Sequence, residues 1–168
     1  KKLNYQEEMD YIVSHEKRNR FIRNLTKTRT GNTLVLFQYV EKHGKILHEL
    51  IGDTLDPYTR KLFFVYGGTD TKDRETVRSI TENENNAIIV ASYGTFSTGI
   101  NIRNLHNVIF ASPTKSKIRI LQSLGRGLRL GDNKVKANLY DIADDFSHKE
   151  RKNFTLSHFM ERINTYSE

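Results

Sequence analysis

The sequence lacks several features that would each define a class of protein. Its 168 residues include no cysteine, which excludes disulfides, a thiolate nucleophile and a zinc site built on thiolates. No apolar run approaches the roughly 18 residues that a membrane-spanning helix needs. The chain begins at Lys1 without a methionine, and no signal peptide precedes the first helical pattern. We expect it to be part of a longer protein.

Catalytic motifs that act within a single domain are missing as well. No G-x-S-x-G sequence is present, and the six histidines are scattered, so nucleophilic hydrolysis has no support. Gly44-Lys45-Ile46 lacks an upstream glycine and is no Walker A loop. No Asp-Glu pair follows a predicted strand to hold magnesium, so we expect no ATP hydrolysis by this chain alone. No His or Glu stands at metal-ligand spacing from Asp141, Asp144 and Asp145, and no metal site is predicted.

The charge of the chain is positive and unevenly distributed. The formal net charge is +7, from 27 basic and 20 acidic residues. Residues 103–136 contain eight of the basic residues and a single acidic one, Asp132. A basic balance of this size suggests a polyanionic partner, most often a nucleic acid.

Short apolar runs alternate with segments of helical periodicity. The run at 33–37 is continuously apolar, which predicts a strand buried on both faces, as in a parallel sheet. The alternation predicts one α/β domain with a parallel sheet flanked by helices. Predicted strands are 33–37, 62–65, 87–91, 108–111 and 137–142, and predicted helices are 4–13, 14–28, 41–51, 71–81, 116–129 and a last one from Ser147.

Details of two helices follow from their sequences. Asn4 and Ser14 are predicted N-caps, the former within a capping box. The apolar stripe of the second helix is predicted at Phe21, Ile22 and Leu25, and that of the helix 41–51 at Ile46, Leu47 and Leu50.

The loops after the strands are the candidate site, because ligands of parallel sheets bind beyond the carboxyl ends of the strands. Gln38-Tyr39 precede a helix whose free amide groups form an anion site. Gly67-Gly68 permits close backbone approach, and Arg74 follows on the next helix. The hydroxyl- and glycine-rich segment 92–99 is predicted to be a turn. Its hydroxyls and glycine amides could hold nucleic-acid phosphates, but taken alone the residues favour a tight polar turn without a ligand.

A basic helical segment at 118–131 carries the spacing Q-x-x-G-R-x-x-R, formed by Gln122, Gly125, Arg126 and Arg129. The two arginines are three residues apart, so they share one side of a helix and can reach one anion together. Guanidinium groups match phosphate oxygens in charge and geometry. A solvated basic helix is the alternative, but glycines inside a helix cost about 1 kcal/mol each unless close approach is needed.

Three of these segments together resemble the second RecA-like domain of superfamily 2 helicases. Residues 33–47 resemble its motif IV, 91–102 its motif V and 122–129 its motif VI, and the resemblance covers roughly residues 14–146. The motif V segment is similar to that of phage recombination helicases. The resemblance implies a P-loop NTPase-like domain without a Walker A loop, preceded by a helix or linker at 1–13 and followed by a C-terminal helix at 147–168.

The resemblance also implies roles for individual residues. Arg126 and Arg129 would be arginine fingers for the γ-phosphate of ATP, and Gln122 would contact that phosphate or couple it to motif V. Most ATP contacts and the Mg²⁺ ion would come from a first RecA-like domain of the same polypeptide. Gly99, Asn101 and Gly125 would lie near the nucleotide. Nucleic acid would contact Gln38, Tyr39, Gly67, Arg74, Ser92, Thr95 and Thr98.

The function implied is an ATP-dependent DNA helicase that acts on branched DNA in recombination, repair and replication. Fork regression, Holliday-junction branch migration and R-loop unwinding are the implied reactions. The implied location is the cytoplasm, that of the host if the protein is phage-encoded. Two alternatives remain open from the residues: a nucleic-acid-binding module without motor activity, and an RNA helicase domain.

Overall fold

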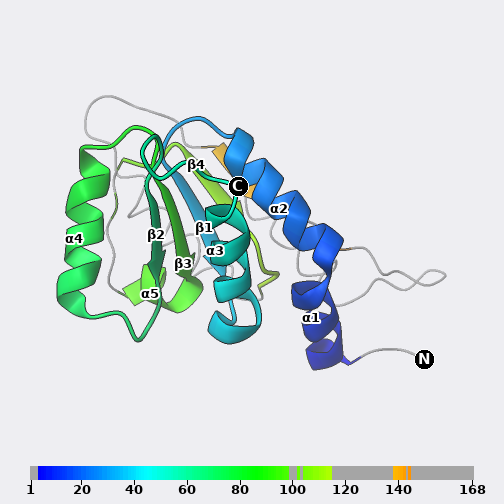
Figure 1. Cartoon of the computed structure of the whole chain (residues 1–168). Coiled ribbons are helices and arrows are strands. Elements are labelled where there is room, and N and C mark those ends of the chain that lie inside the picture. Colours follow the sequence, from blue (N-terminus) through cyan, green and yellow to red (C-terminus); the bar gives the residue numbers. More distant parts are fainter. Residues whose placement is uncertain (1–3, 99–101, 103, 115–137, 143, 145–168) are drawn as a thin grey trace, which may run out of the picture.

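A computed structural model of the chain describes residues 4–98, 102, 104–114, 138–142 and 144 (Figure 1). Five strands and their helices follow one another along the chain. None of the helices in these ranges is long and apolar enough to cross a membrane. The elements are α1 (Tyr5–Ser14), α2 (Glu16–Thr28), β1 (Thr33–Phe37), the π-helix η1 (Val40–Gly44), α3 (Lys45–Gly52), β2 (Leu62–Val65), α4 (Thr71–Glu82), β3 (Ile88–Ser92), α5 (Tyr93–Thr98), β4 (Asn107–Phe110) and β5 (Asn138–Asp141).

The five strands form one sheet in the order β2-β3-β1-β4-β5, and every neighbouring pair is parallel. All carboxyl ends therefore lie at the same edge of the sheet, which confirms the predicted parallel α/β architecture. The central strands β1, β3 and β4 are buried along their whole length. The edge strands β2 and β5 are more exposed, as expected where a strand has one neighbour.

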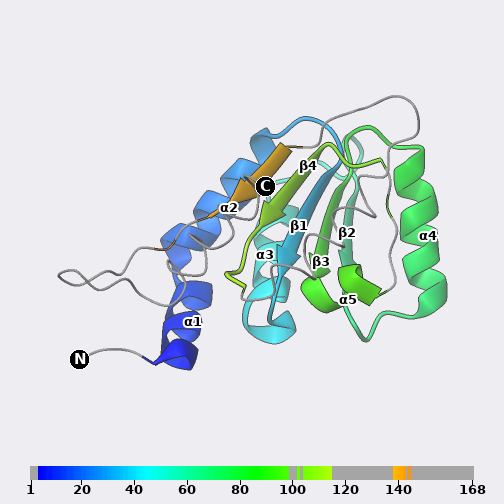
Figure 2. The ribbon, with the colours of Figure 1, turned by 180° about the vertical axis from the view of Figure 1, so that it is seen from behind.

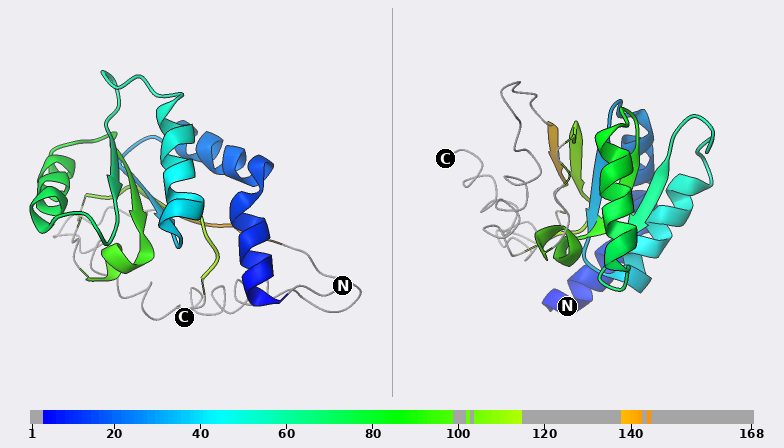
Figure 3. Two further views of the ribbon diagram at one scale, coloured as in Figure 1. Left: turned by 60° about the horizontal axis from the view of Figure 1, so that its bottom comes forward. Right: turned by 90° about the vertical axis from the view of Figure 1, so that its left-hand side faces the viewer.

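Alternate residues of the central strands face opposite sides of the sheet, and helices cover both sides (Figures 1, 2 and 3). On one side α2 and α3 supply Ile22, Leu47 and Ile51 to the core. On the other side α4 and α5 supply Val77 and Tyr93. The strands contribute Val35, Phe37, Ile88, Val90 and Ile109 to the first side, and Leu34, Leu36, Ile89, Ala91, Val108 and Phe110 to the second.

One of the two predicted N-caps is confirmed. Asn4 Oδ1 accepts a hydrogen bond from the Glu7 backbone at 2.8 Å, and Glu7 Oε2 accepts one from the Asn4 backbone at 3.2 Å, which completes a capping box. The prediction for Ser14 is wrong, because Ser14 is the last residue of α1. His15 caps α2 instead, since its Nδ1 accepts from a backbone N–H of the first turn at 3.2 Å.

In each of two helices, one residue predicted to face the core is exposed instead. Phe21 is 55% exposed and Ile46 is 38% exposed, whereas Ile22 and Leu47 are fully buried. The segment before α3 forms the wider turn of a π-helix, which rotates the following face relative to a regular helix. Gly44 permits this turn, because a Cβ there would lie 2.4 Å from the ring of Phe37.

A single buried side chain connects three segments at the amino ends of the strands. Asn32 is fully buried, and its Oδ1 accepts from the backbone N–H of Ala87 at 2.8 Å. Its Nδ2 donates to the carbonyls of Glu84 and Asn104, both at 2.8 Å. Asn32 therefore sets the positions of the segments that enter β3 and β4 relative to β1.

Replacing Asn32 with alanine would remove the partner of the Ala87 N–H and the Asn32 donor to the Asn104 carbonyl, whereas the Glu84 carbonyl would keep its hydrogen bond from Asn104 Nδ2. Each buried unpaired group costs about 1–3 kcal/mol, so Asn32→Ala is expected to lower the free energy of unfolding by about 3 kcal/mol in a urea titration. The matched control is Asn85→Ala at an exposed position, with an expected change within about 0.5 kcal/mol. Equal stability of the two variants would contradict this role for Asn32.

Candidate functional site

Ser112 joins four elements at the carboxyl edge of the sheet. It follows β4, and its Oγ accepts a hydrogen bond from the backbone N–H of Gln38, directly after β1, at 3.1 Å. The same hydroxyl lies 2.7 Å from His43 Nδ1 in η1. The Ser112 carbonyl accepts a hydrogen bond from the hydroxyl of Tyr93, the first residue of α5. The ends of β1 and β4, the π-helix and α5 are thus connected through one residue.

His43 is the buried centre of this network and is neutral. It is fully buried, and its Nε2 lies 2.9 Å from Asn19 Oδ1. Asn19 Nδ2 donates to the carbonyl of Val13 at 3.0 Å, so Oδ1 is the atom that accepts from His43. Nε2 therefore carries the proton, and Nδ1 accepts from Ser112. Burial, with a smaller effect of the Arg18 charge, lowers the pKa of His43 to about 3.

Arg18 connects α2 to the same edge. Its guanidinium forms two bonds with the carboxylate of Asp144, at 2.6 and 3.0 Å, and Nη1 donates to the carbonyl of Ala111 at 2.5 Å. Both side chains of the ion pair are about nine-tenths buried, with exposures of 9% and 8%. Paired geometry of this kind is strong and directional. It holds the start of α2 against the chain that leaves β4 and β5.

The predicted turn at 92–99 is wrong in form, because β3 extends to Ser92 and α5 covers Tyr93–Thr98. Ser92 Oγ accepts from the Thr95 backbone at 3.3 Å and lies 2.7 Å from Thr95 Oγ1. Ser92 thus caps the amino end of the short helix. The sequence contains this capping serine, but the many polar residues around it favoured the prediction of a turn. Ser92 is 9% and Thr95 2% exposed, so both hydroxyls are largely shielded from solvent in this structure. Their contact with DNA, like that of Thr98, stays a prediction.

Gln38 and Tyr39 lie at the carboxyl edge between β1 and η1. The Gln38 side chain is exposed. The Tyr39 hydroxyl donates to Gln6 Oε1 at 3.4 Å, and Lys42 Nζ lies 5.6 Å from the Tyr39 ring. An exposed amide and a cation beside an aromatic ring are groups that phosphates and bases can contact, and the predicted role of both residues stays a prediction.

Arg74 folds back onto the loop between β2 and α4. Its Nε donates to the Thr69 carbonyl at 3.0 Å and its Nη2 to the Gly67 carbonyl at 2.8 Å. The guanidinium therefore orders this loop. A Cβ at Gly67 would meet no atom within 4 Å, so a ligand can approach the backbone there. Nucleic-acid contacts by Gly67 and Arg74 stay predictions.

The predicted catalytic and nucleotide-contacting residues lie outside the described residues. They are Gln122, Gly125, Arg126, Arg129, Gly99 and Asn101. The predicted helices at 116–129 and from Ser147 lie outside them as well. The described chain leads toward this segment at Thr114, two residues after Ser112. The division into 1–13, 14–146 and 147–168 stays a prediction.

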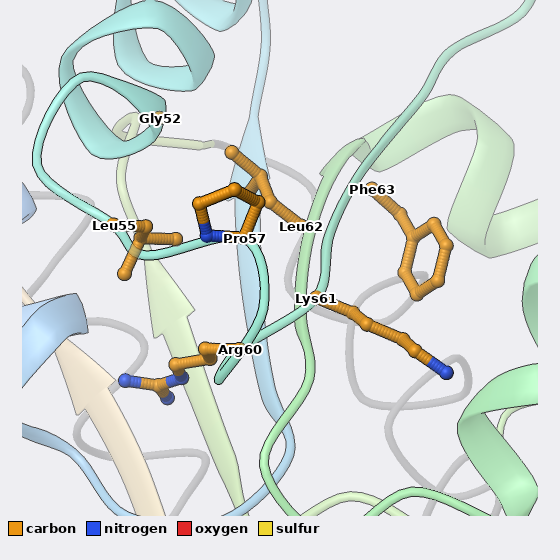
Figure 4. Close-up of a pocket in the computed structure, with 7 residues that line it drawn as sticks. All are labelled: Gly52, Leu55, Pro57, Arg60, Lys61, Leu62 and Phe63. Atoms are coloured by element: carbon orange, nitrogen blue, oxygen red, sulfur yellow. The ribbon is translucent and has the colours of Figure 1, made fainter.

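A pocket of about 370 Å³ lies beside the amino end of β2, at the end of the sheet opposite to the carboxyl edge (Figure 4). Its wall includes Arg60, whose guanidinium donates to the carbonyls of Asn86 and Arg29, both at 2.9 Å. Arg60 thus closes the carboxyl end of α2. The lining residues are Gly52, Leu55, Pro57, Arg60, Lys61, Leu62 and Phe63. Because the strands are parallel, this pocket is remote from the candidate site.

The residues that organise the carboxyl edge were not found by sequence reasoning. Asn19, His43, Tyr93 and Ser112 are separated by 19 to 69 positions in the hydrogen bonds that join them, and no short motif links them. In the sequence these residues are visible only as polar residues within or next to apolar segments. That pattern is too common to predict which polar residues form a hydrogen-bond network.

The buried neutral state of His43 makes the stability of the protein depend on pH. The folded-state pKa is about 3, below the unfolded value of about 6.5. The unfolded chain therefore binds a proton that the folded chain excludes. Above about pH 6.5 His43 is neutral in both states and does not reduce the free energy of unfolding. Between pH 6.5 and pH 4 the free energy of unfolding is expected to fall by about 3 kcal/mol because of this group.

Histidine NMR titration isolates this effect from that of other groups. The His43 ring signal is expected to keep its neutral position down to about pH 4 while the protein stays folded. Urea titrations over the same range measure the accompanying loss of stability. A His43 titration midpoint near 6.5 in the folded protein would contradict the assignment.

Comparisons with known proteins identify the family of the chain. Residues 16–131 match the family "Helicase conserved C-terminal domain". The sequence is 37% identical to the ATP-dependent DNA helicase uvsW of Enterobacteria phage T4, over 98% of this chain and 34% of that protein. The crystal structure of T4 UvsW matches with a TM-score of 0.77, over 98% of this chain and 35% of that one. The chain thus spans about a third of this relative.

Two more distant structures share the fold. The C-terminal part of the Fun30 ATPase domain matches with a TM-score of 0.62 at 16% identity, over 98% of this chain and 57% of that one. The E. coli DEAD-box protein SrmB matches with a TM-score of 0.54 at 18% identity, over 75% of this chain and 71% of that one. The predicted RecA-like fold and the similarity to a phage helicase are confirmed, and the chain belongs to the helicase conserved C-terminal domain family.

Proposed function

We propose that this chain is the second motor domain of an ATP-dependent superfamily 2 DNA helicase. It works with a first RecA-like domain in the same polypeptide, which supplies the Walker A loop and the Mg²⁺ ligands. The observation that carries the proposal is the junction at Ser112. There α5, in the motif V segment, is hydrogen-bonded to Ser112, which lies between β4 and the segment 118–131 that carries the Q-x-x-G-R-x-x-R spacing. In this proposal the response to ATP and the contacts with DNA are coupled at this edge of the sheet.

The nucleotide half of the mechanism rests on residues 122–129. Arg126 and Arg129 stabilise the charge that develops on the γ-phosphate, with Gln122 beside them. Gly99, Asn101 and Gly125 line the nucleotide. Arginine fingers of this kind contribute 10³- to 10⁵-fold in rate in related phosphoryl-transfer systems. Since the chain contains no Walker A loop, it does not hydrolyse ATP without the first domain.

The DNA half rests on the loops after β1, β2 and β3. Gln38, Tyr39, Gly67 and the α5 segment contact the phosphate backbone, with Arg74 holding the loop at Gly67 in place. Backbone contacts carry little base information, so binding is independent of sequence and weakened by salt. Closing of the two lobes on ATP and their opening after hydrolysis shift the grip along the strand.

The substrates we propose are branched DNA molecules. Support comes from the 37% identity to a DNA helicase of phage T4 and from the amino-acid sequence of the motif V segment at 92–102, which resembles that of phage recombination helicases. Fork regression, migration of four-way junctions and removal of R-loops are the corresponding reactions in recombination, repair and replication.

The finger assignment is tested by Arg126→Ala in the full-length protein. The kcat of DNA-stimulated ATP hydrolysis is expected to fall at least 10³-fold, while the Kd for DNA changes only severalfold. Arg119→Ala removes the same charge from the same predicted helix outside the motif and serves as the control. Normal turnover by Arg126→Ala would overturn the assignment, and a full-length protein with no Walker A loop would favour the non-motor binding module.

Substrate choice is tested with matched synthetic substrates of equal length. The full-length protein is expected to convert forks and four-way junctions faster than linear duplexes of the same sequence, with ATP required in each case. An RNA–DNA hybrid and an RNA duplex complete the set. Equal rates on linear and branched DNA would exclude the branched-DNA role, and a preference for RNA duplexes would favour the RNA helicase alternative.

A further inference from the structure

The outward side of α2 carries a row of cations. Lys17, Arg20 and Lys27 are exposed and Arg23 is half-buried. Their spacing of three, three and four residues places them along one side of the helix. The buried residues Asn19, Ile22 and Thr26 lie on a different side of the helix, which packs on the domain. We call Lys17, Arg20, Arg23 and Lys27 the α2 basic stripe.

The cations of the α2 basic stripe lack carboxylate partners in the part of the chain that the structure describes. Exposed cations elsewhere differ. Lys42 pairs with Asp10 at 3.1 Å, and Lys61 pairs with Glu84 at 2.5 Å. Among the described residues the one carboxylate of α2, Glu16, forms no ion pair with these four cations, so the cations repel one another, and a polyanion that binds them removes an unfavourable interaction.

An exposed aromatic ring lies next to the α2 basic stripe. Phe21 is 55% exposed and has no place in the core. An aromatic ring among arginines and lysines is a combination that contacts sugars and bases beside neutralised phosphates. An acidic protein surface would use the cations but would leave this ring in water. The ring therefore favours a nucleic acid as the occupant.

Both ends of α2 are fixed to the domain, so the α2 basic stripe is presented rigidly. Arg18 holds its start through the Ala111 carbonyl and Asp144. Arg60 closes its carboxyl end through the carbonyls of Lys27 and Arg29, at 3.2 and 2.9 Å. The helix runs beside the sheet on the side of β4, starting near the carboxyl edge (Figures 1 and 2).

We propose that the α2 basic stripe binds the phosphate backbone of a DNA duplex, as a second contact apart from the loops at the carboxyl edge. Lys17 and Lys27 are about 15 Å apart along the helix axis at 1.5 Å per residue. A duplex of that length carries about nine phosphate charges. This inference rests on the proposed DNA helicase function and adds a site that none of the helicase motifs contains.

Two charge-matched double variants of the full-length protein test the proposal. Arg20→Gln with Lys27→Gln removes two charges from the α2 basic stripe. Lys61→Gln with Arg78→Gln removes two charges from positions that pair with carboxylates elsewhere. Glutamine keeps a high helix propensity, and thermal melting checks that both variants fold. The Kd for duplex DNA is measured by fluorescence anisotropy at several salt concentrations.

The stripe variant is expected to bind duplex DNA about tenfold or more weakly at low salt. The slope of log K against log salt is negative, and for this variant its magnitude is expected to be smaller by about 2, since each lost phosphate contact removes about 0.9. The control variant is expected to keep the wild-type slope, and both variants to keep wild-type ATP hydrolysis without DNA. Equal slopes for the two variants overturn the stripe site.

The two proposals fail in different ways in this experiment. If the stripe variant binds DNA like the wild type while Arg126→Ala abolishes ATP hydrolysis, the stripe site is wrong and the helicase function stands. If the wild-type protein neither binds DNA nor hydrolyses ATP, the helicase function is wrong and the stripe site falls with it.

Discussion

The hydrogen bonds around Ser112 hold together the edge of the sheet on which the proposed function depends. One hydroxyl serves both the backbone after β1 and the ring of His43, and one carbonyl serves the first residue of α5. These groups are buried, so each would be costly if left unpaired. The network requires a neutral His43, and burial keeps the pKa of that ring near 3. Protonation inside the folded protein is therefore excluded at physiological pH.

This constraint gives the domain two fixed edges with different tasks. At the carboxyl edge the network links the ends of β1 and β4, the π-helix and α5. At the amino edge Asn32 and Arg60 connect the segments before β2, β3 and β4. Helix α2 is attached at both edges, through Arg18 and Arg60. Its outward cations therefore occupy positions that the fold determines.

Much of the fold could be predicted from the sequence, because buried parallel strands have a strong local signal. The apolar runs at 33–37 and 62–65 became β1 and β2 with the predicted bounds, and their order with the helices specified a parallel sheet. The errors arose where a local rule competed with packing. Ser14 has the chemistry of an N-cap but ends α1, and the polar segment after β3 is a short helix capped by Ser92. Ile46 faces outward because the turn before it is a π-helix that Gly44 permits against Phe37.

The sequence by itself determined the fold class, the family resemblance and the motif segments, because these depend on periodicity and on residues close together in the chain. Only the tertiary structure decided which polar residues meet. His43 contacts Asn19 and Ser112, which lie 24 and 69 positions away, and no local pattern encodes such pairs. The same holds for Phe21, which the sequence assigned to the core and the structure places among the cations of α2. Burial is a property of the assembled layers, and so is the difference between a core residue and a binding residue.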